Sequence, residues 1–376
     1  MKLAVRIAFT TVLALAVASM TAATSAKPKS AGKPTVRVRG VPMTVGKPLT
    51  YENLTVFPVQ ETGKGGVPTG YLSLEEALKK RLIKVSEVAD GGDVNSVIVT
   101  SKTKAPIYLM SGDIILGGQQ DRQIQDDTII PPSARKMRVP VFCVEHGRWT
   151  GGEQFTGNTV ASGKLRLETQ QSRDQQQVWD TVAAEAKQAK AITPTGTYRA
   201  VAEGKVMKAK VDRYTGRLSA GLRKDNNCVG IIVAVNGKVT AADIFGNRTL
   251  WRKQMTKTVK SYALDAARSH AQWWATKKKA VARPAEAVAL LADYGKGKRT
   301  TLSNSPTMRN AQVESPKAMS FEAVPCSPSK TTPSFSHINI YNKSANPAPP
   351  TRTVPSPRTV SPSRPVPNPA HLPSRE

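Results

Sequence analysis

Residues 231–245 read IIVAVNGKVTAADIF, in which two runs of apolar and β-branched residues flank the dipeptide Asn236-Gly237. An Asn-Gly pair of this kind favours a type I′ turn, because both central residues of that turn take positive φ angles. The sequence therefore predicts a β-hairpin, with one strand over 231–235 and the other over 238–245.

Helical spacing appears on either side of this hairpin. Residues 250–274 carry apolar side chains at helical intervals and predict a long amphipathic helix that packs on the hairpin. Residues 170–190 predict a second helix. Residues 73–82 predict a short one, because Ser73 and Glu76 have the spacing of a capping box.

Short β-type runs dominate the preceding half of the chain. A strand is predicted over 54–59, and further apolar runs separated by turn residues lie at 97–100, 107–110, 114–116, 128–130 and 137–144. The predicted fold class is α+β. We expect a β-rich meander, roll or sandwich core over about 54–149, a C-terminal β-hairpin and two or three packed helices.

The two ends of the chain differ in composition from its middle. Residues 1–26 combine a basic start, an apolar run and small residues, which predicts a secretory signal peptide and export to a bacterial periplasm or the extracellular space. The apolar run is too short for a spanning helix, so no transmembrane anchor is expected after processing. We expect a flexible lead-in at 27–50, a single globular domain at 51–275 and a basic, Pro/Ser-rich disordered tail at 276–376.

The chain is strongly basic, with 55 Lys and Arg against 27 Asp and Glu and a formal net charge of +28. Such a charge attracts anionic partners, and we expect anionic envelope polymers or acidic proteins to bind the tail. Nucleic acid is a weaker expectation, because aromatic residues make up only 5% of the chain and offer little stacking surface. The basic residues of 257–279 also fit a solvated helix face.

Cofactor and metal signatures are lacking in the sequence. It contains no nucleophile elbow, phosphate loop or dinucleotide fingerprint, so we expect no cofactor. Cys143, Cys228 and Cys326 lie far apart and only four histidines are present, so no metal site is expected. A Cys143–Cys228 disulfide and a buried thiol at Cys143 both remain open.

Two polar clusters are the candidate sites. In the first, glycines precede hydrogen-bonding side chains, and Arg122 has the geometry to grip a carboxylate or phosphate. In the second, Glu145 and His146 are candidate acid/base groups and Trp149 offers a stacking face. The alternative for both clusters is structural, as turns and sheet edges whose polar groups bond within the protein.

Several blocks together resemble a prokaryotic domain family, in the expected order over roughly 51–275. The blocks are 54–58, 71–77, 112–122 (GDIILGGQQDR), 139–149 (VPVFCVEHGRW) and 229–246. The family is named the ARG and rhodanese-phosphatase-superfamily-associated protein domain. It has no established reaction, and its name implies an association with nucleotide-related biology. The resemblance adds weight to the ligand-binding candidates, which are Asp113, Gln120, Arg122, Glu145, Arg148 and Trp149.

The leading functional hypothesis is an exported, non-enzymatic binding or scaffold module, held at the envelope by its basic tail. The alternative is an enzyme acting on a small anionic or phosphorylated, nucleotide-like ligand. In that alternative, Arg122 or Arg148 binds the charge and Glu145 or Asp113 acts as acid or base. Catalytic residues, the ligand and the oligomeric state are not assigned by the sequence.

Overall fold

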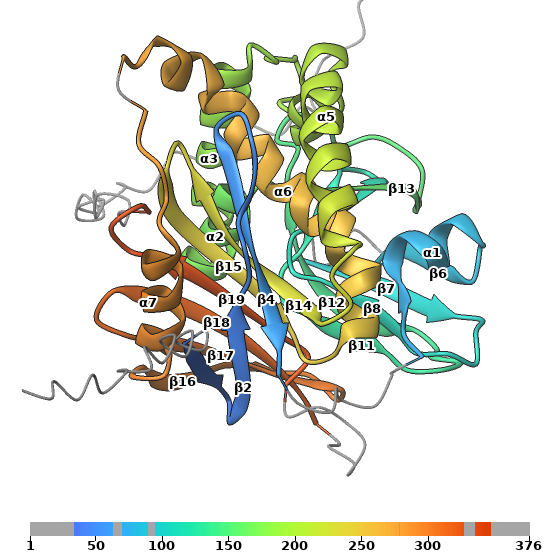
Figure 1. The fold of residues 1–376 in the computed structure, drawn as a ribbon. Helices are drawn as coiled ribbons and strands as arrows, with labels where there is room; N and C mark the ends of the chain where they lie inside the picture. The colour runs from blue at the N-terminus through green and yellow to red at the C-terminus, as the bar shows by residue number, and fades with distance from the viewer. Residues whose placement is uncertain (1–33, 63–69, 89–94, 278, 327–334, 347–376) are drawn as a thin grey trace, which may run out of the picture. The chain divides into compact units, whose positions relative to one another are not determined.

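A computed structural model describes residues 34–62, 70–88, 95–277, 279–326 and 335–346 (Figure 1). Its large sheet combines strands from the first, middle and last parts of these residues. Its strand order is β1-β2-β4-β14-β15-β19-β18-β17-β16, and β3 also pairs with β4. All of these pairings are antiparallel. Along this path the strands are β1 (Thr35–Val38), β2 (Val41–Val45), β4 (Leu54–Glu61), β14 (Cys228–Val235), β15 (Lys238–Phe245), β19 (His337–Asn342), β18 (Ala318–Pro325), β17 (Met308–Glu314) and β16 (Lys298–Asn304), and the additional strand β3 is Leu49–Tyr51.

Two smaller β structures complete the strands of the described residues. A closed barrel contains β10 (Arg122–Ile124), β12 (Met137–Cys143), β7 (Ser96–Ser101), β6 (Ile83–Glu87), β13 (Gln154–Val160) and β9 (Asp113–Gly117). A three-stranded sheet contains β11 (Thr128–Ile130), β8 (Ile107–Leu109) and β5 (Leu72–Ser73). The predicted α+β class and β-rich core are therefore confirmed, with the core as a barrel beside a large sheet.

Helices pack on both faces of the large sheet and around the barrel. The helices of the described residues are α1 (Leu74–Lys79), α2 (Gly163–Ser172), α3 (Gln175–Ala189), α4 (Tyr198–Glu203), α5 (Lys205–Leu222), α6 (Arg248–Ala275) and α7 (Pro284–Tyr294). The long helix α6 packs on β14 and β15 and also contacts β13 of the barrel, whereas α7 packs on β1, β2, β18 and β19. No helix in the described part of the chain is both long and apolar enough to cross a membrane.

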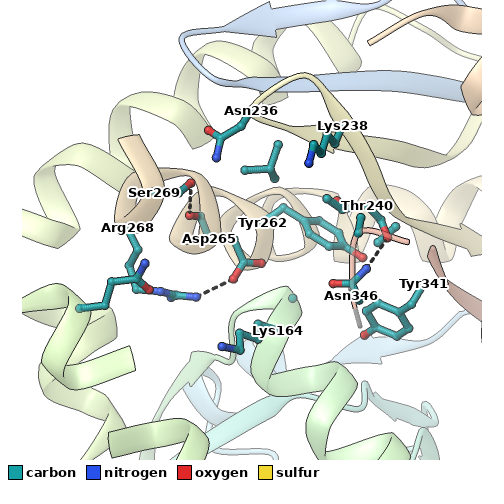
Figure 2. Close-up of a pocket in the computed structure, with 15 residues that line it drawn as sticks. Lys164, Asn236, Lys238, Thr240, Tyr262, Asp265, Arg268, Ser269, Tyr341 and Asn346 are labelled. Carbon is teal, nitrogen blue, oxygen red and sulfur yellow. Dashed lines mark hydrogen bonds and ion pairs between the residues drawn. The ribbon is translucent and has the colours of Figure 1, made fainter. Parts of the chain in front are cut away.

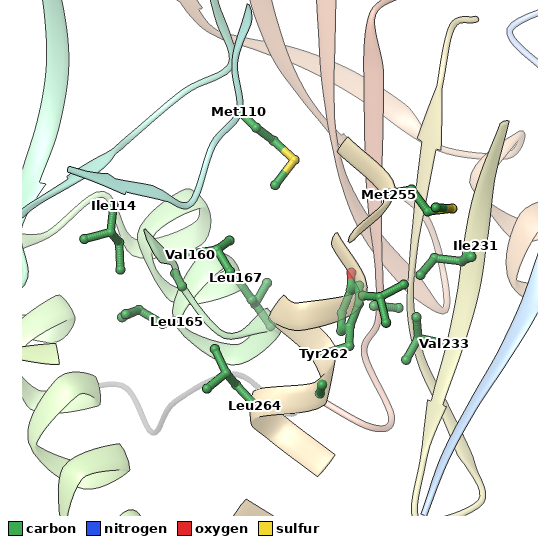
Figure 3. Packing of buried hydrophobic residues seen from close by; sticks show 14 of the residues in the cluster. Met110, Ile114, Val160, Leu165, Leu167, Ile231, Val233, Met255, Tyr262 and Leu264 are labelled. Carbon is green, nitrogen blue, oxygen red and sulfur yellow. The ribbon is translucent and has the colours of Figure 1, made fainter. Parts of the chain in front are cut away.

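Strand β14 explains why this sheet has two cores. Ile231 and Val233 belong to the cluster around α6, and Ile232 and Ala234 belong to the cluster beneath α7. Successive residues of a strand point to opposite faces, so a strand covered on both faces needs an unbroken apolar run. Figure 3 shows Ile231 and Val233 packed near Tyr262 and Met255 of α6.

The predicted hairpin and its turn are confirmed. Asn236 and Gly237 have φ angles of 52° and 77°, as a type I′ turn requires. The capping box is also present, since Ser73 accepts from the Glu76 amide and Glu76 accepts from the Ser73 amide. The helix predicted over 170–190 is instead two helices, α2 and α3, because Arg173 takes a left-handed conformation between them.

Both predicted flexible segments need correction. The lead-in at 27–50 contains β1, β2 and part of β3, and the tail predicted from residue 276 contains α7 and β16 to β19. These strands add to the edges of the sheet and were not predicted because polar residues interrupt their apolar pattern. The predicted signal peptide at 1–26 and residues 347–376 lie outside the described residues.

Candidate functional site

Four of the six predicted ligand-binding residues form one network near the ends of β9 and β12. The network centres on Arg148, whose Nε donates to Glu145 at 2.9 Å and whose Nη1 donates to the carbonyl of Gly118 at 2.8 Å. Asp121 lies 3.4 Å from Arg148 Nη2. Hydrogen bonds from Arg148 lower the pKa of Glu145 although burial raises it, so the carboxylate stays charged.

Gln120 and Arg122 extend this network into the barrel. The Gln120 amide nitrogen donates to the Glu145 carbonyl at 2.8 Å, and its oxygen accepts from Arg122 at 2.9 Å. Arg122 also contacts Cys143 and lies 3.4 Å from Glu87. Only 1% of Arg122 is exposed. Its positive charge therefore interacts with other groups of the protein.

Asp113 and Trp149 lie apart from this network. Asp113 is fully buried and forms an ion pair with Lys257 of α6 at 2.5 Å. Trp149 is 55% exposed. The network residues bond mainly to the protein's own atoms, which is the arrangement expected for a structural role. Ligand binding by the six residues remains a prediction, and Arg148 provides its test below.

A second site was not predicted. A cleft of about 380 Å³, here called the hairpin cleft, opens beside the tip of the β14–β15 hairpin (Figure 2). Its walls come from α2, α3, the hairpin, α6 and the residues that follow β19. The labelled lining residues in Figure 2 are Lys164, Asn236, Lys238, Thr240, Tyr262, Asp265, Arg268, Ser269, Tyr341 and Asn346. Distant segments thus meet at one polar cavity, which spacing along the chain does not reveal.

Two lysines give the hairpin cleft its positive charge. Lys164 and Lys238 are exposed, and no hydrogen bond or ion pair joins either ammonium to another residue drawn in Figure 2. Asn53 donates to the amide oxygen of Asn236 at 2.7 Å, which leaves the Asn236 amide nitrogen to serve other acceptors. The cleft thus presents cations and an amide donor, the groups that recognise a small anion.

Beneath the lysines, one arginine separates two carboxylates. Arg268 lies 2.9 Å from Glu185 and 2.6 Å from Asp265. The Asp265 side chain is 19% exposed, and that of Glu185 only 1%. Burial raises the pKa of both carboxyls despite Arg268, and repulsion between them raises that of Glu185 further. Asp265 is therefore a carboxyl of raised pKa that reaches the cleft.

Glycine at position 163 permits this geometry. Asp265 accepts from the backbone amides of Gly163 and Lys164 at the start of α2. A Cβ atom at Gly163 would lie 2.6 Å from an Asp265 oxygen and 2.7 Å from the Tyr262 ring. Only glycine allows the carboxylate this close, where the partial positive charge of the helix start stabilises its ionised form.

A third polar group lies buried between α2, the large sheet and the loop before β11. The His337 ring bonds to Asp127 and to Asp243, each at 2.7 Å, and stacks on Phe245. Arg166 forms a fully buried bidentate pair with Asp243 at 2.7 and 3.2 Å. His337 was predicted to lie in the tail, so no sequence signal pointed to this arrangement.

His337 predicts a loss of stability in mild alkali. Burial lowers its pKa, but the two carboxylates prevail and raise it from 6.5 to about 9. A raised pKa stabilises the fold fully below pH 6.5, and this contribution disappears as the pH rises through 9. We expect urea unfolding to show a free energy that falls by up to ~1.4 kcal/mol per pH unit in this window. Equal wild-type stability at pH 6.5 and pH 9 would contradict the assignment.

The cysteines and possible metal ligands were also the subject of sequence predictions. In the described structure Cys143 and Cys228 are both buried and are not joined by a disulfide. Cys228 instead donates to the Gly230 carbonyl at 3.2 Å. No cluster of three or more His, Cys, Asp or Glu side chains suited to a metal occurs within the described ranges. The expectations of no metal and no cofactor remain predictions.

One family model matches residues 42–328. It is described as the ARG and Rhodanese-Phosphatase-superfamily-associated Protein domain. The match extends well past residue 275 and includes α7 and β16 to β18. No curated protein matches the chain at a significant level, and neither does any solved structure.

Proposed function

The chain belongs to the ARG and Rhodanese-Phosphatase-superfamily-associated Protein domain family, and we propose that it is a non-enzymatic binding module whose hairpin cleft takes a small anionic ligand. The observation that carries this proposal is the pair of exposed ammonium groups, Lys164 and Lys238, at a cavity of about 380 Å³. A cavity of that size suits a small molecule.

The charges around the cleft favour an anion. Arg268 is already compensated by Glu185 and Asp265, so the two lysines supply the remaining charge. Because these carboxyls have raised pKa values, the cleft becomes more positive as they take up protons. A phosphate or carboxylate group between the lysines fits this field, with the Asn236 amide as a further donor.

Export and envelope association remain part of the proposal. Residues 1–26 support export through their composition alone. The proposed tether now falls on residues 347–376, because residues 279–326 and 335–346 are folded. In this setting the module would meet its ligand outside the cytoplasm.

Asp265 favours one alternative, an enzyme that acts on the same anionic ligand. A carboxyl with a raised pKa lies nearer to the range that general acid–base catalysis uses. In this alternative, Asp265 takes the acid/base role that the sequence hypothesis gave to Glu145 or Asp113. Replacing Asp265 with asparagine should then abolish turnover without weakening the binding of an anion, because a negative charge leaves the cleft.

Thermal shift measurements with inorganic phosphate, ribose 5-phosphate and AMP test the binding proposal. A ligand that binds only the folded chain raises its melting temperature. We expect at least one probe to stabilise the wild type. In Lys164→Ala/Lys238→Ala the dissociation constant of that probe should rise by about tenfold or more, because two unshielded charges are lost.

Arg148→Ala is the matched control, since it also removes a cation. It should lower the melting temperature by breaking the Glu145 network but leave the ligand-induced shift intact. If Arg148→Ala abolishes the shift and the double lysine variant retains it, the ligand binds at the predicted cluster and the hairpin cleft is not the site. No shift with any of the probes in the wild type also counts against the proposal.

A further inference from the structure

The C-terminal end of α6 and the segment after it expose apolar side chains. Trp274 is 65% exposed and Val281 is 81% exposed, and they are two of the five large apolar side chains exposed in the described structure. They lie within eight residues of each other. We call this surface the α6-end patch, and its residues are His270, Trp273, Trp274, Lys277, Lys279 and Val281.

The patch is also basic and almost free of acidic neighbours in sequence. Between Asp265 and Glu286 the chain has five basic residues and no acidic one. Arg268 and Arg283 pair with nearby carboxylates, which leaves Lys277 and Lys279 as uncompensated charge among the described residues. Glu52, 3.4 Å from His270, is the acidic group that contacts the patch.

The two indole rings hold a lysine at the same surface. The Lys279 ammonium lies 4.1 Å from the centre of the Trp273 ring and 4.5 Å from that of Trp274. Cation–π attraction of this kind places a charge and two amphipathic rings side by side. Tryptophan and lysine together are the residues that favour the headgroup region of a bilayer, where an indole is half in contact with hydrocarbon.

We propose that the α6-end patch docks the protein on the surface of an anionic lipid bilayer. Trp273, Trp274 and Val281 enter the interfacial region while Lys277 and Lys279 contact lipid phosphates. Nucleic acid fits this patch less well, because Lys279 covers the indole faces on which bases would stack. The apolar side chain of Val281 would also make no favourable contact with a polyanion. This proposal is independent of the ligand in the hairpin cleft.

Vesicle binding by the full chain tests the proposal. The probes are vesicles of phosphatidylcholine with about one third phosphatidylglycerol, with pure phosphatidylcholine vesicles as the neutral comparison. We expect Trp273→Ala/Trp274→Ala to lower the partition coefficient on anionic vesicles by about tenfold or more. Trp149→Ala removes an exposed indole elsewhere and should bind like the wild type. The wild type and both variants keep residues 1–33 and 347–376, so a difference in their vesicle binding is due to the patch.

Charge reversal gives a second comparison. Lys277→Glu/Lys279→Glu should lose binding to anionic vesicles at low salt, whereas Lys102→Glu/Lys104→Glu, two exposed lysines at the same spacing, should retain it. Brominated lipid should quench tryptophan emission in Trp149→Ala but not in Trp273→Ala/Trp274→Ala. Equal partitioning of the patch and control variants would overturn the proposal. Patch-dependent binding to heparin or DNA, without binding to vesicles, would also overturn the proposal.

Discussion

Replacing Asp243 with asparagine is expected to lower the free energy of unfolding by about 3–5 kcal/mol, the usual cost of leaving one charge of a buried pair uncompensated. Arg166 and Asp243 have fully buried side chains, and Asp243 also accepts from His337 and Asn339. The Arg166 charge holds the pKa of Asp243 well below its usual range although burial alone would raise it. Urea unfolding at neutral pH measures the loss.

Asp212→Asn is the matched control for this prediction. It breaks an ion pair of 2.6 Å with Lys208, but both side chains are about half exposed. Exposed pairs of this kind are worth less than ~0.5 kcal/mol, so little change is expected. Similar losses in the two variants would show that burial of the Arg166–Asp243 pair is not what makes it important.

A chain ending at Ala275, the predicted domain boundary, is expected to lose its cooperative unfolding transition. It lacks β19, the partner of β15, and it lacks the apolar side chains of α7 and β19 that fill the second core. Leu290, Leu291, Ile338 and Ile340 are at least 96% buried, and each contributes ~1.5–3 kcal/mol. Their sum approaches the ~5–15 kcal/mol stability of a typical domain.

The comparison is a chain ending at Asn346, which keeps every described strand and helix. Near-ultraviolet circular dichroism during heating should show one sharp transition for this chain and none for the chain ending at Ala275. A cooperative transition in the shorter chain would mean that the domain folds without residues 276–346, as the sequence predicted, and that the C-terminal strands only add to a finished domain.

Local sequence signals identified the elements that local chemistry controls. The Asn236-Gly237 turn and the Ser73–Glu76 capping box each depend on neighbouring residues, and both are present. The helix at 250–274 was also predicted, because its apolar side chains follow the helical repeat and pack on the hairpin. Such features need no knowledge of distant partners.

The C-terminal strands were missed because several of their buried residues are polar and interrupt the apolar pattern. Glu322 of β18 is 2% exposed and bonds to Arg39, Tyr294 and Arg299. His337 of β19 has its partners more than ninety residues away. A buried polar residue with distant partners looks like a solvated one in a sequence, so the segment was assigned to a disordered tail.

The candidate sites also depend partly on local sequence and partly on contacts between distant residues. The residue types at the predicted cluster were suited to binding charge, but folding supplies that charge from Glu145, Asp121 and Glu87. The hairpin cleft joins Lys164, Lys238 and Asp265, which lie on three separate elements. Only the fold shows which arginines are already paired and which lysines still face a cavity.

Amide chemical shifts during a titration with inorganic phosphate test whether the hairpin cleft is the anion site. They report the location of a bound anion without any substitution in the chain. We predict that the amides of Lys164, Asn236 and Lys238 move together and saturate. Movement confined to 117–122 and 145–148, with the hairpin cleft unchanged, would contradict it and return the ligand site to the cluster around Arg148.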